Sequence, residues 1–251
     1  FGAVYLATDI GLQRSVAIKL LKPGYRGYDE QTKARFLREA NVIANLSDPH
    51  TVTLFDFGAT DSGLLYMVFE HLPGRDLSDL LFEAGRLPEQ ATVHILRQLL
   101  LSLGEAHSAG ILHRDIKPEN VRVFDYMDDP LRVKLLDFGI AKPVNPGEAA
   151  ITDTGGMIGT PRYMAPEHLL GDALSPPSDL YSLGLVAYEM LLGRQSLVEG
   201  NTPQERLRRL AAGPTAVRTS SASTTAAALP RGPLPRATRS AAAPASRARP
   251  T

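Results

Sequence analysis

The first 72 residues alternate short apolar runs with polar turns, and this pattern predicts β-strands. Apolar runs cover residues 4–7 and 15–21, and the polar stretch between them favours a hairpin. Two more strands are expected within residues 51–59 and 64–72, joined by a turn that contains Gly63. Lys19 is then a charged residue inside an apolar strand.

Between residues 29 and 46 the apolar spacing changes to that of a helix. Phe36, Ala40 and Ile43 follow one another at intervals of four and three residues, so they share one helix face. Glu39 lies beside this face. The N-terminal part is therefore expected to be a small sheet with one helix.

Beyond Pro73 and Gly74 the pattern is mainly helical. Pro88 and Glu89 start a long amphipathic helix that ends near Gly110. Its apolar face is expected to comprise Val93, Leu96, Leu99, Leu100 and Leu103. Further elements are two short strands within residues 120–126 and 132–139, a buried helix over 178–193 and a last helix over 202–212. The predicted fold class is α+β.

Composition narrows the classes of protein that this chain can belong to. An apolar content of 43% is enough for a core, and the absence of cysteine excludes disulfides, thiolate nucleophiles and zinc–thiolate sites. No run of about 18 apolar residues suggests a membrane span, and the N-terminal residues lack the pattern of a secretory signal. We expect a soluble chain.

The net charge of zero conceals two segments of opposite charge. Nine of the 27 basic residues follow Glu205 and no acidic residue does, so residues 1–205 carry a net charge of −9 and the rest +9. Residues 213–251 consist largely of Ala, Ser, Thr, Pro and Arg, which cannot form a core, and are expected to be disordered. Because their arginines are scattered, no nucleic-acid partner is expected.

Six short motifs carry the candidate chemistry, and each alone has an ordinary structural explanation. They are VAIK (16–19), Glu39, HRDIKPEN (113–120), LLDFG (135–139), GTPRYMAPE (159–167) and SDLYSLG (178–184). In this order they match the signature of the protein kinases. From residue 1 to about residue 212 the chain resembles the bacterial (Hanks-type) Ser/Thr protein kinase catalytic domain.

The resemblance implies a bilobal protein-kinase-like fold with a small β-sheet N-lobe and a mainly helical C-lobe. The N-lobe would span residues 1–72 and the C-lobe residues 73–212. We expect the domain to be incomplete at both termini, because the family's first strand, the first glycines of its glycine-rich loop and its last helices have no counterpart in the sequence.

The resemblance also assigns roles in phosphoryl transfer. Asp115 would accept the proton of the substrate hydroxyl, Lys117 would reach the γ-phosphate, and Lys19 would bind the α- and β-phosphates with Glu39 as its ion-pair partner. Asn120 and Asp137 would bind Mg²⁺. The expected ATP-binding residues are Gly2, Val4, Ala17, Lys19, Glu70, Leu72, Asp76 and Asn120.

Further roles follow from the same resemblance. Phe69 would be the gatekeeper of the adenine pocket, and Asp179 would anchor a regulatory spine of Phe55, Ile43, Phe138 and His113. Two residues depart from the family pattern. Arg122 replaces an apolar residue under the adenine and could stack on the base or fold outward. Glu167 has lost the family's arginine partner, and burial would make it destabilising.

The implied function is a protein Ser/Thr kinase that transfers the γ-phosphate of ATP. Arg114 implies regulation by phosphorylation of the following loop, with Thr152 and Thr154 as candidate acceptors and Thr160 as a structural threonine. The alternatives are a pseudokinase or scaffold, an inactive kinase fragment, and a small-molecule phosphotransferase.

The resemblance also indicates partners and location. The expected partners are proteins with Ser or Thr acceptors, including a second copy of the chain. The expected location is the cytoplasm, with a membrane tether elsewhere in the full-length protein as an open alternative.

Overall fold

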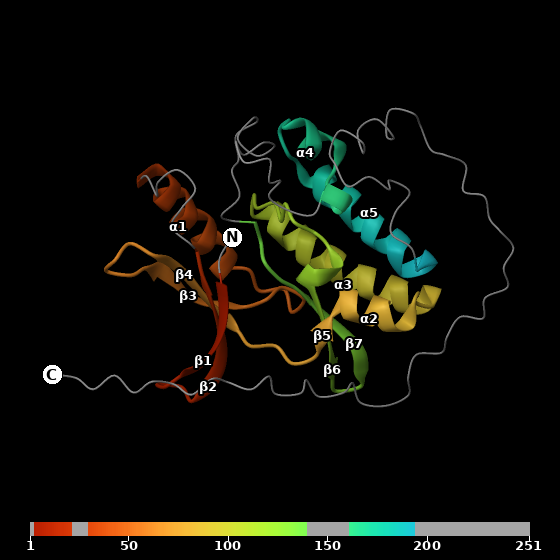
Figure 1. Cartoon of the computed structure of the whole chain (residues 1–251), viewed down its shortest axis with the longest axis horizontal. Helices are drawn as coiled ribbons and strands as arrows, with labels where there is room; N and C mark the ends of the chain where they lie inside the picture. The colour runs from red at the N-terminus through yellow and green to blue at the C-terminus, as the bar shows by residue number, and fades with distance from the viewer. Residues whose placement is uncertain (1–2, 22–29, 140–160, 194–251) are drawn as a thin grey trace, which may run out of the picture.

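The computed structural model describes residues 3–21, 30–139 and 161–193, which form two lobes side by side (Figure 1). Several predictions fall outside these residues: those on Gly2, Thr152, Thr154 and Thr160, on a helix over 202–212 and on a disordered tail. In the part of the chain that is described, no helix is long and apolar enough to cross a membrane.

The N-lobe is a four-stranded antiparallel sheet with one long helix. The strands are β1 (Ala3–Asp9), β2 (Arg14–Leu20), β3 (Leu54–Ala59) and β4 (Leu65–Glu70), in the order β1-β2-β4-β3. Helix α1 (Glu30–Ala44) packs beside them. The prediction of a small sheet with one helix is confirmed.

Helix α1 turns the predicted apolar face inward. Phe36, Ala40 and Ile43 are each at most 2% exposed and lie in the same core as Leu54 and Met67 of the sheet. Burial of such side chains contributes about 1.5–3 kcal/mol for each large residue. The helical spacing therefore identified the contact surface correctly.

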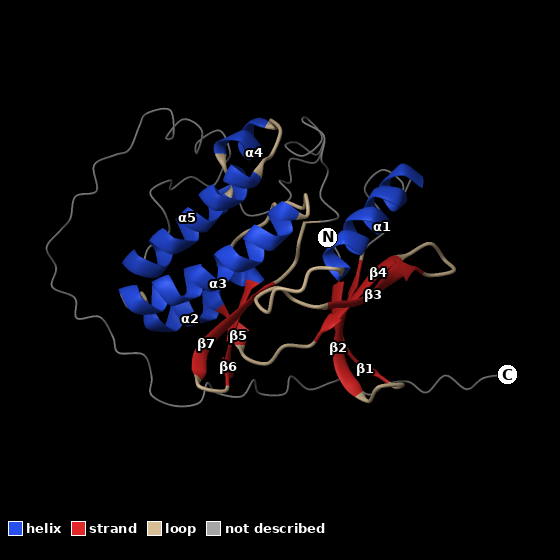
Figure 2. Ribbon diagram, turned by 180° about the vertical axis from the view of Figure 1, so that it is seen from behind, coloured by secondary structure: helices blue, strands red, loops and turns tan. Residues whose placement is uncertain are grey.

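The C-lobe is mainly helical and carries a small sheet on the side that faces the N-lobe (Figure 2). Its helices are α2 (Leu77–Ala84), α3 (Glu89–Ser108), α4 (Pro166–Leu170) and α5 (Pro176–Leu192). Strands β5 (Arg75–Asp76), β6 (Val121–Tyr126) and β7 (Asp129–Leu135) form the antiparallel sheet β5-β6-β7. Two 3₁₀ turns, η1 (Pro118–Asn120) and η2 (Pro161–Tyr163), complete the described elements.

The buried face of α3 differs from the predicted one. Ile95, Leu99 and Leu103 are at most 1% exposed, whereas Val93 is 57% and Leu100 is 48% exposed, so the prediction was wrong for these last two residues. Some buried positions of α3 carry polar side chains, which a search for apolar residues could not identify. The Gln98 amide donates to Leu131 O at 2.9 Å and accepts from the Val133 backbone N–H at 3.0 Å.

The segment between α1 and β3 (residues 45–53) lies against the C-lobe. The backbone N–H groups of Ser47 and Asp48 each donate to the Glu105 carboxylate of α3 at 2.8 Å. Burial raises the pKa of Glu105, but these hydrogen bonds outweigh it and hold the pKa below its usual value. Further along, the backbone groups of His50 and Val52 pair with those of Leu135 in β7.

The lobe linker (residues 71–74) runs from β4 to β5 and rests directly on the C-lobe sheet. Gly74 adopts a φ of +85°, and a Cβ atom built on it would lie 2.1 Å from the carbonyl oxygen of Val123 in β6. Both the left-handed conformation and this close approach require glycine. The linker is therefore packed backbone to backbone against β6.

The contrast between Leu99 and Leu100 provides a stability test of the α3 packing. Leu99→Ala is expected to lower the free energy of unfolding by about 3 kcal/mol, because it leaves a cavity at a fully buried position. Leu100→Ala removes the same atoms from a half-exposed position and should cost less than about 1 kcal/mol. Urea denaturation of both variants measures the difference, and equal losses would contradict the assigned face.

Candidate active site

The loop 113–120, between α3 and β6, is held by one carboxylate of α5. Asp179 is 3% exposed, and its Oδ2 accepts hydrogen bonds from the His113 backbone N–H and from His107 Nε2, each at 2.8 Å. Its Oδ1 accepts from the Arg114 backbone N–H at 2.9 Å. Both oxygens are therefore used to fix the start of the loop.

Two residues of the site have a left-handed backbone although neither is glycine. Arg114 has a φ of +63° and Asp137 a φ of +54°. Such a conformation costs roughly 1–3 kcal/mol and persists only where neighbouring contacts impose it. For Arg114 the imposing contact is the hydrogen bond to Asp179.

His113 links this loop to the segment 136–139. Its Nε2–H donates to Leu136 O at 2.7 Å, while its Nδ1 accepts from the Asp115 backbone N–H at 3.2 Å, and this pair of bonds defines the ring tautomer. The backbone N–H of Gly139 donates to His113 O at 2.9 Å. The imidazole therefore fixes the backbone at Asp115 relative to the backbone next to Asp137.

Three of the four residues predicted for the spine are buried, and two of them are in direct ring contact. The ring centroids of His113 and Phe138 are 4.8 Å apart, and both side chains are buried, as is Ile43. The prediction for Phe55 was wrong: this side chain is 37% exposed and lies under the Arg14 guanidinium. A register shift at this point of β3 turns Phe55 outward and leaves Leu54 in the core.

Asp115, Lys117 and Asn120 form a connected group within the loop. The Lys117 Nζ atom lies 3.2 Å from Asp115 Oδ2. The Asn120 amide nitrogen donates to the carbonyl oxygen of Asp115 at 2.7 Å and to its Oδ2 at 3.1 Å. These bonds hold the Asp115 carboxylate and leave Asn120 Oδ1 as the amide atom able to bind a cation.

Lys19 and Glu39 each have a different partner from the one that the resemblance implied. Lys19 Nζ is 2.9 Å from Asp137 Oδ1, and the Glu39 carboxylate is 3.4 Å from a guanidinium nitrogen of Arg114. Both pairs join the N-lobe to the C-lobe, since Lys19 lies on β2 and Glu39 on α1. The structure therefore shows an arrangement in which Lys19 and Glu39 are not joined.

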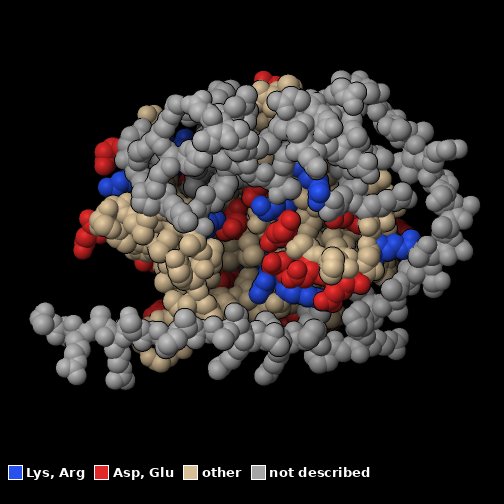
Figure 3. All heavy atoms as spheres, viewed as in Figure 1, with Lys and Arg blue, Asp and Glu red and all other residues tan. Residues whose placement is uncertain are grey.

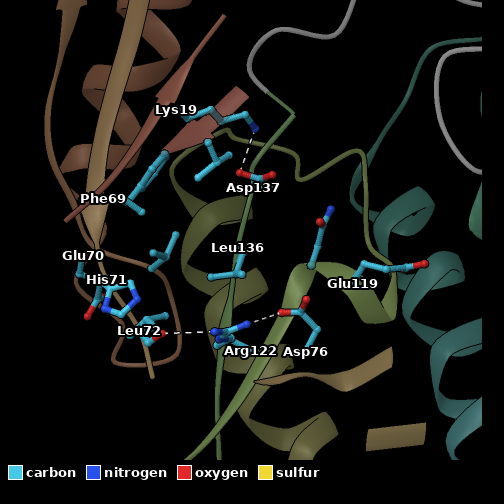
Figure 4. Close-up of a pocket in the computed structure, with 14 residues that line it drawn as sticks. Lys19, Phe69, Glu70, His71, Leu72, Asp76, Glu119, Arg122, Leu136 and Asp137 are labelled. Atoms are coloured by element: carbon cyan, nitrogen blue, oxygen red, sulfur yellow. Dashed lines mark hydrogen bonds and ion pairs between the residues drawn. The ribbon is translucent and has the colours of Figure 1, made fainter. Parts of the chain in front are cut away.

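A cavity of about 270 Å³ lies between the lobes and gathers most of the predicted nucleotide-binding residues. Figure 4 shows Lys19 and Asp137 at one end and Leu72, Asp76 and Arg122 at the other. Those predicted by the resemblance are Val4, Ala17, Lys19, Phe69, Glu70, Leu72, Asp76, Asn120 and Asp137. Val52, His71, Glu119 and Leu136 also line the cavity and were not predicted.

Arg122 binds the lobe linker and Asp76. Its Nε donates to Pro73 O at 3.1 Å, one terminal nitrogen lies 3.5 Å from Leu72 O, and the other donates to Asp76 Oδ1 at 2.8 Å (Figure 4). The guanidinium therefore does not fold outward. The guanidinium is at the cavity wall with three protein acceptors.

A second cation of the same sheet, Lys134, binds the end of β4, directly before the linker. Lys134 of β7 pairs across the strands with Arg122 of β6, and its ammonium contacts the Glu70 carboxylate at the end of β4. The Glu70 carboxylate also accepts from the Thr53 backbone N–H at 2.7 Å. Sequence reasoning missed Lys134, although a lysine that alternates with Val133 and Leu135 on a strand was the available signal.

Charged residues of both signs meet along the boundary between the lobes. Figure 3 shows Lys and Arg side chains beside Asp and Glu side chains across the middle of this face. The ion pairs in this region are Lys19–Asp137, Arg114–Glu39, Lys117–Asp115, Arg122–Asp76 and Lys134–Glu70. Each of these cations therefore already has a carboxylate partner among the described residues.

The oxygen atoms at the inner end of the cavity suit a magnesium ion. Mg²⁺ binds hard oxygen ligands and is usually held by one or two carboxylates together with substrate phosphates. The Asp137 carboxylate and the Asn120 amide oxygen are of this type, and both residues line the cavity. The donor set therefore fits the ion, although no cluster of three His, Cys, Asp or Glu residues occurs among the described residues.

Beyond the cavity, η2 is tied to α5. The hydroxyl of Tyr163 donates to the Glu189 carboxylate, and burial together with this bond raises the pKa of Tyr163. Glu167, at the start of α4, is half-buried rather than buried, and no side-chain partner of Glu167 is found among the described residues. Partial exposure to water lowers the cost expected for an unpaired carboxylate.

Comparisons with known proteins agree with this geometry. The family model of the protein kinase domain matches residues 1–230. The chain is 39% identical over 194 residues to serine/threonine-protein kinase pkn3 of Myxococcus xanthus, covering 76% of the chain and 35% of pkn3. It is 41% identical over 190 residues to PknL of Mycobacterium tuberculosis, covering 76% of the chain and 46% of PknL.

A solved structure is similar as well. The crystal structure of the PknI kinase domain of Mycobacterium tuberculosis matches with a TM-score of 0.61 and 30% identity, covering 77% of the chain and 70% of that domain. The chain therefore belongs to the protein kinase family, and the curated relatives named here are bacterial serine/threonine kinases. It spans less than half the length of these relatives.

Asp179 offers a test of how the loop is held. Asp179→Asn is expected to lower the free energy of unfolding by about 3 kcal/mol, because an amide keeps one acceptor oxygen where the structure uses two. Asp172→Asn, an exposed change close in sequence, should stay within about 0.5 kcal/mol. Denaturation curves of the two variants give the comparison, and a neutral Asp179→Asn would overturn the assigned role.

Proposed function

We propose that the chain transfers the γ-phosphoryl group of ATP to Ser or Thr hydroxyls of proteins. The observation that carries the proposal is the position of Asp115, Lys117 and Asn120 on one fixed loop, with Lys19 and Asp137 at the inner end of the adjoining cavity. Phosphoryl transfer depends on positioning and charge stabilisation, which such a convergence supplies. Family membership and the names of the relatives support the same activity.

In this reaction each residue has one task. The substrate hydroxyl oxygen forms a bond to the γ-phosphorus as the bond from that phosphorus to the ADP oxygen breaks, and Asp115 accepts the hydroxyl proton. Lys117 moves from Asp115 to the γ-phosphate, and Lys19 moves from Asp137 to the α- and β-phosphates. These exchanges free both carboxylates for the reaction.

A magnesium ion bound with the nucleotide would neutralise charge on the phosphates. Asp137 and Asn120 are the residues that would hold it, and Asp137 can do so once Lys19 has left its carboxylate. Lys19 would therefore have to leave Asp137 for the phosphates before Asp137 could hold the ion.

A scaffold without turnover is the second candidate. It is favoured by the partners of Lys19 and Glu39, because the ion pair that active kinases require between them is replaced by Lys19–Asp137 and Arg114–Glu39. The two candidates differ in whether the partners can be exchanged when nucleotide binds.

Labelled ATP separates the two candidates. With γ-labelled ATP, Mg²⁺ and a generic Ser/Thr substrate, the chain is expected to transfer label, while Asp115→Asn should lose at least about 100-fold of the rate through loss of the proton acceptor. Lys33→Met, a change in the first turn of α1 outside the cavity, is the control and should retain the rate. Binding of ATP without transfer would favour the scaffold, and absence of ATP binding would refute both uses of the cavity.

We also propose that phosphorylation regulates the site through Arg114. Arg114 binds Glu39 at 3.4 Å, and a phosphate is a stronger partner for a guanidinium than a carboxylate at this distance. A phosphate near Arg114 would release Glu39 and allow it to reach Lys19. Thr152 and Thr154, which lie outside the described residues, are the proposed acceptors.

Mass spectrometry tests this proposal. After incubation with Mg²⁺ and ATP, phosphate is expected on Thr152 or Thr154, and replacing both by Ala should lower the transfer rate by about 10-fold or more. Thr202→Ala serves as a matched control with no expected effect. An active preparation without phosphate at either residue would exclude this regulation.

A further inference from the structure

We propose that Arg122 is a positioning residue that makes the cavity selective for the ribose of the nucleotide, by holding Asp76 toward the sugar. This inference rests on the proposed use of the cavity for ATP. Arg122 itself binds no phosphate in the proposal; it acts through the Asp76 carboxylate.

Asp76 occupies the N-cap position of α2 but does not cap the helix. Its backbone has the extended conformation of an N-cap residue, with φ −74° and ψ 152°, yet no hydrogen bond joins its side chain to the first backbone N–H groups of α2. Aspartate is among the residues that most favour this capping bond. Another contact must therefore hold the carboxylate away from the N-terminus of α2.

Arg122 is the residue that draws it away. A terminal nitrogen of Arg122 donates to Asp76 Oδ1 at 2.8 Å, and the two residues are directly paired in the register of β5 and β6. The same guanidinium donates to Pro73 O at 3.1 Å, which fixes its own orientation. The planar fork of arginine can serve these acceptors together, whereas a lysine ammonium on a flexible stem cannot do so as rigidly.

The held carboxylate still has an acceptor for the ligand. Both Asp76 and Arg122 line the cavity, and their side chains are 34% and 25% exposed. No partner of Asp76 Oδ2 is found among the described residues, so this oxygen remains to accept a hydrogen bond from a sugar hydroxyl. The guanidinium nitrogens of Arg122 already donate to Pro73 O, Leu72 O and Asp76 Oδ1, so the acceptor for a sugar hydroxyl is Asp76 Oδ2.

The pair also removes an electrostatic conflict. An unpaired carboxylate at the cavity wall would repel a triphosphate, and the adjacent guanidinium offsets that charge while leaving the acceptor in place. Without Arg122 the carboxylate is free to rotate to the N-terminus of α2 and cap it. The expected result is a cavity that binds the base and phosphates but no longer recognises the sugar.

The test compares ATP with 2′,3′-dideoxyATP, which lacks both sugar hydroxyls. Dissociation constants are measured by calorimetry with Mg²⁺ on the chain, and the wild type is expected to prefer ATP by about 10-fold, the value of a hydrogen bond to a charged group. Asp76→Ala and Arg122→Leu should each reduce the preference to about twofold or less. The double variant should show no further reduction, because both changes remove one interaction.

Two further variants make the result decisive. Arg132→Leu makes the same substitution on β7 outside the cavity, where Arg132 lies over Tyr126, and should keep the 10-fold preference. Arg122→Lys should retain at most half of the wild-type preference, and it carries the test if Arg122→Leu does not fold. A purely structural role of Arg122 would change both affinities equally and leave their ratio intact.

The outcomes separate this inference from the proposed function. If the wild type binds ATP and Arg122→Leu or Arg122→Lys keeps the full preference for ATP, the positioning role is wrong and the proposed function stands. If the wild type binds both nucleotides equally, the ribose is not recognised and the inference fails alone. If the wild type binds neither nucleotide, the proposed function fails and the inference with it.

Discussion

The candidate site depends on a single buried carboxylate outside it. Asp179 of α5 accepts the backbone N–H groups of His113 and Arg114, and the second of these bonds maintains a left-handed residue immediately before Asp115. Since His113 in turn binds both ends of the segment 136–139, one helix end determines where Asp115 and Asp137 lie. The loop can therefore hold a dense set of charges with no more regular structure than the 3₁₀ turn η1.

The charges between the lobes are arranged as pairs that a nucleotide would rearrange. Lys19, Lys117 and Arg114 each bind a carboxylate that the proposed reaction needs for another purpose. Paired charges are less costly to bury than single ones, so these groups can lie close together between the lobes. The Arg122–Asp76 pair differs, because the proposed ligand uses it intact.

The sequence predicted those features that depend on local spacing or on ordered motifs. The face of α1 followed from the spacing of Phe36, Ala40 and Ile43, and most of the nucleotide-binding residues named from the motif order line the cavity. The spacing failed for Val93 and Leu100, because buried Gln98 is satisfied by backbone groups of a distant strand. The ion-pair partners of Lys19 and Glu39 could not be predicted from the sequence either. They depend on the relative position of α1 and the loop 113–120, which no local pattern encodes.

The two segments that approach the C-lobe from the N-lobe have a mechanical consequence. The α1–β3 segment is bonded to Glu105 and Leu135, and the lobe linker is held by Arg122, by Lys134 through Glu70, and by the close packing of Gly74 on β6. Both segments are thus fixed to the C-lobe. Any rotation of the N-lobe relative to the C-lobe would therefore have its hinge beyond these attachments, where β3 begins and β4 ends.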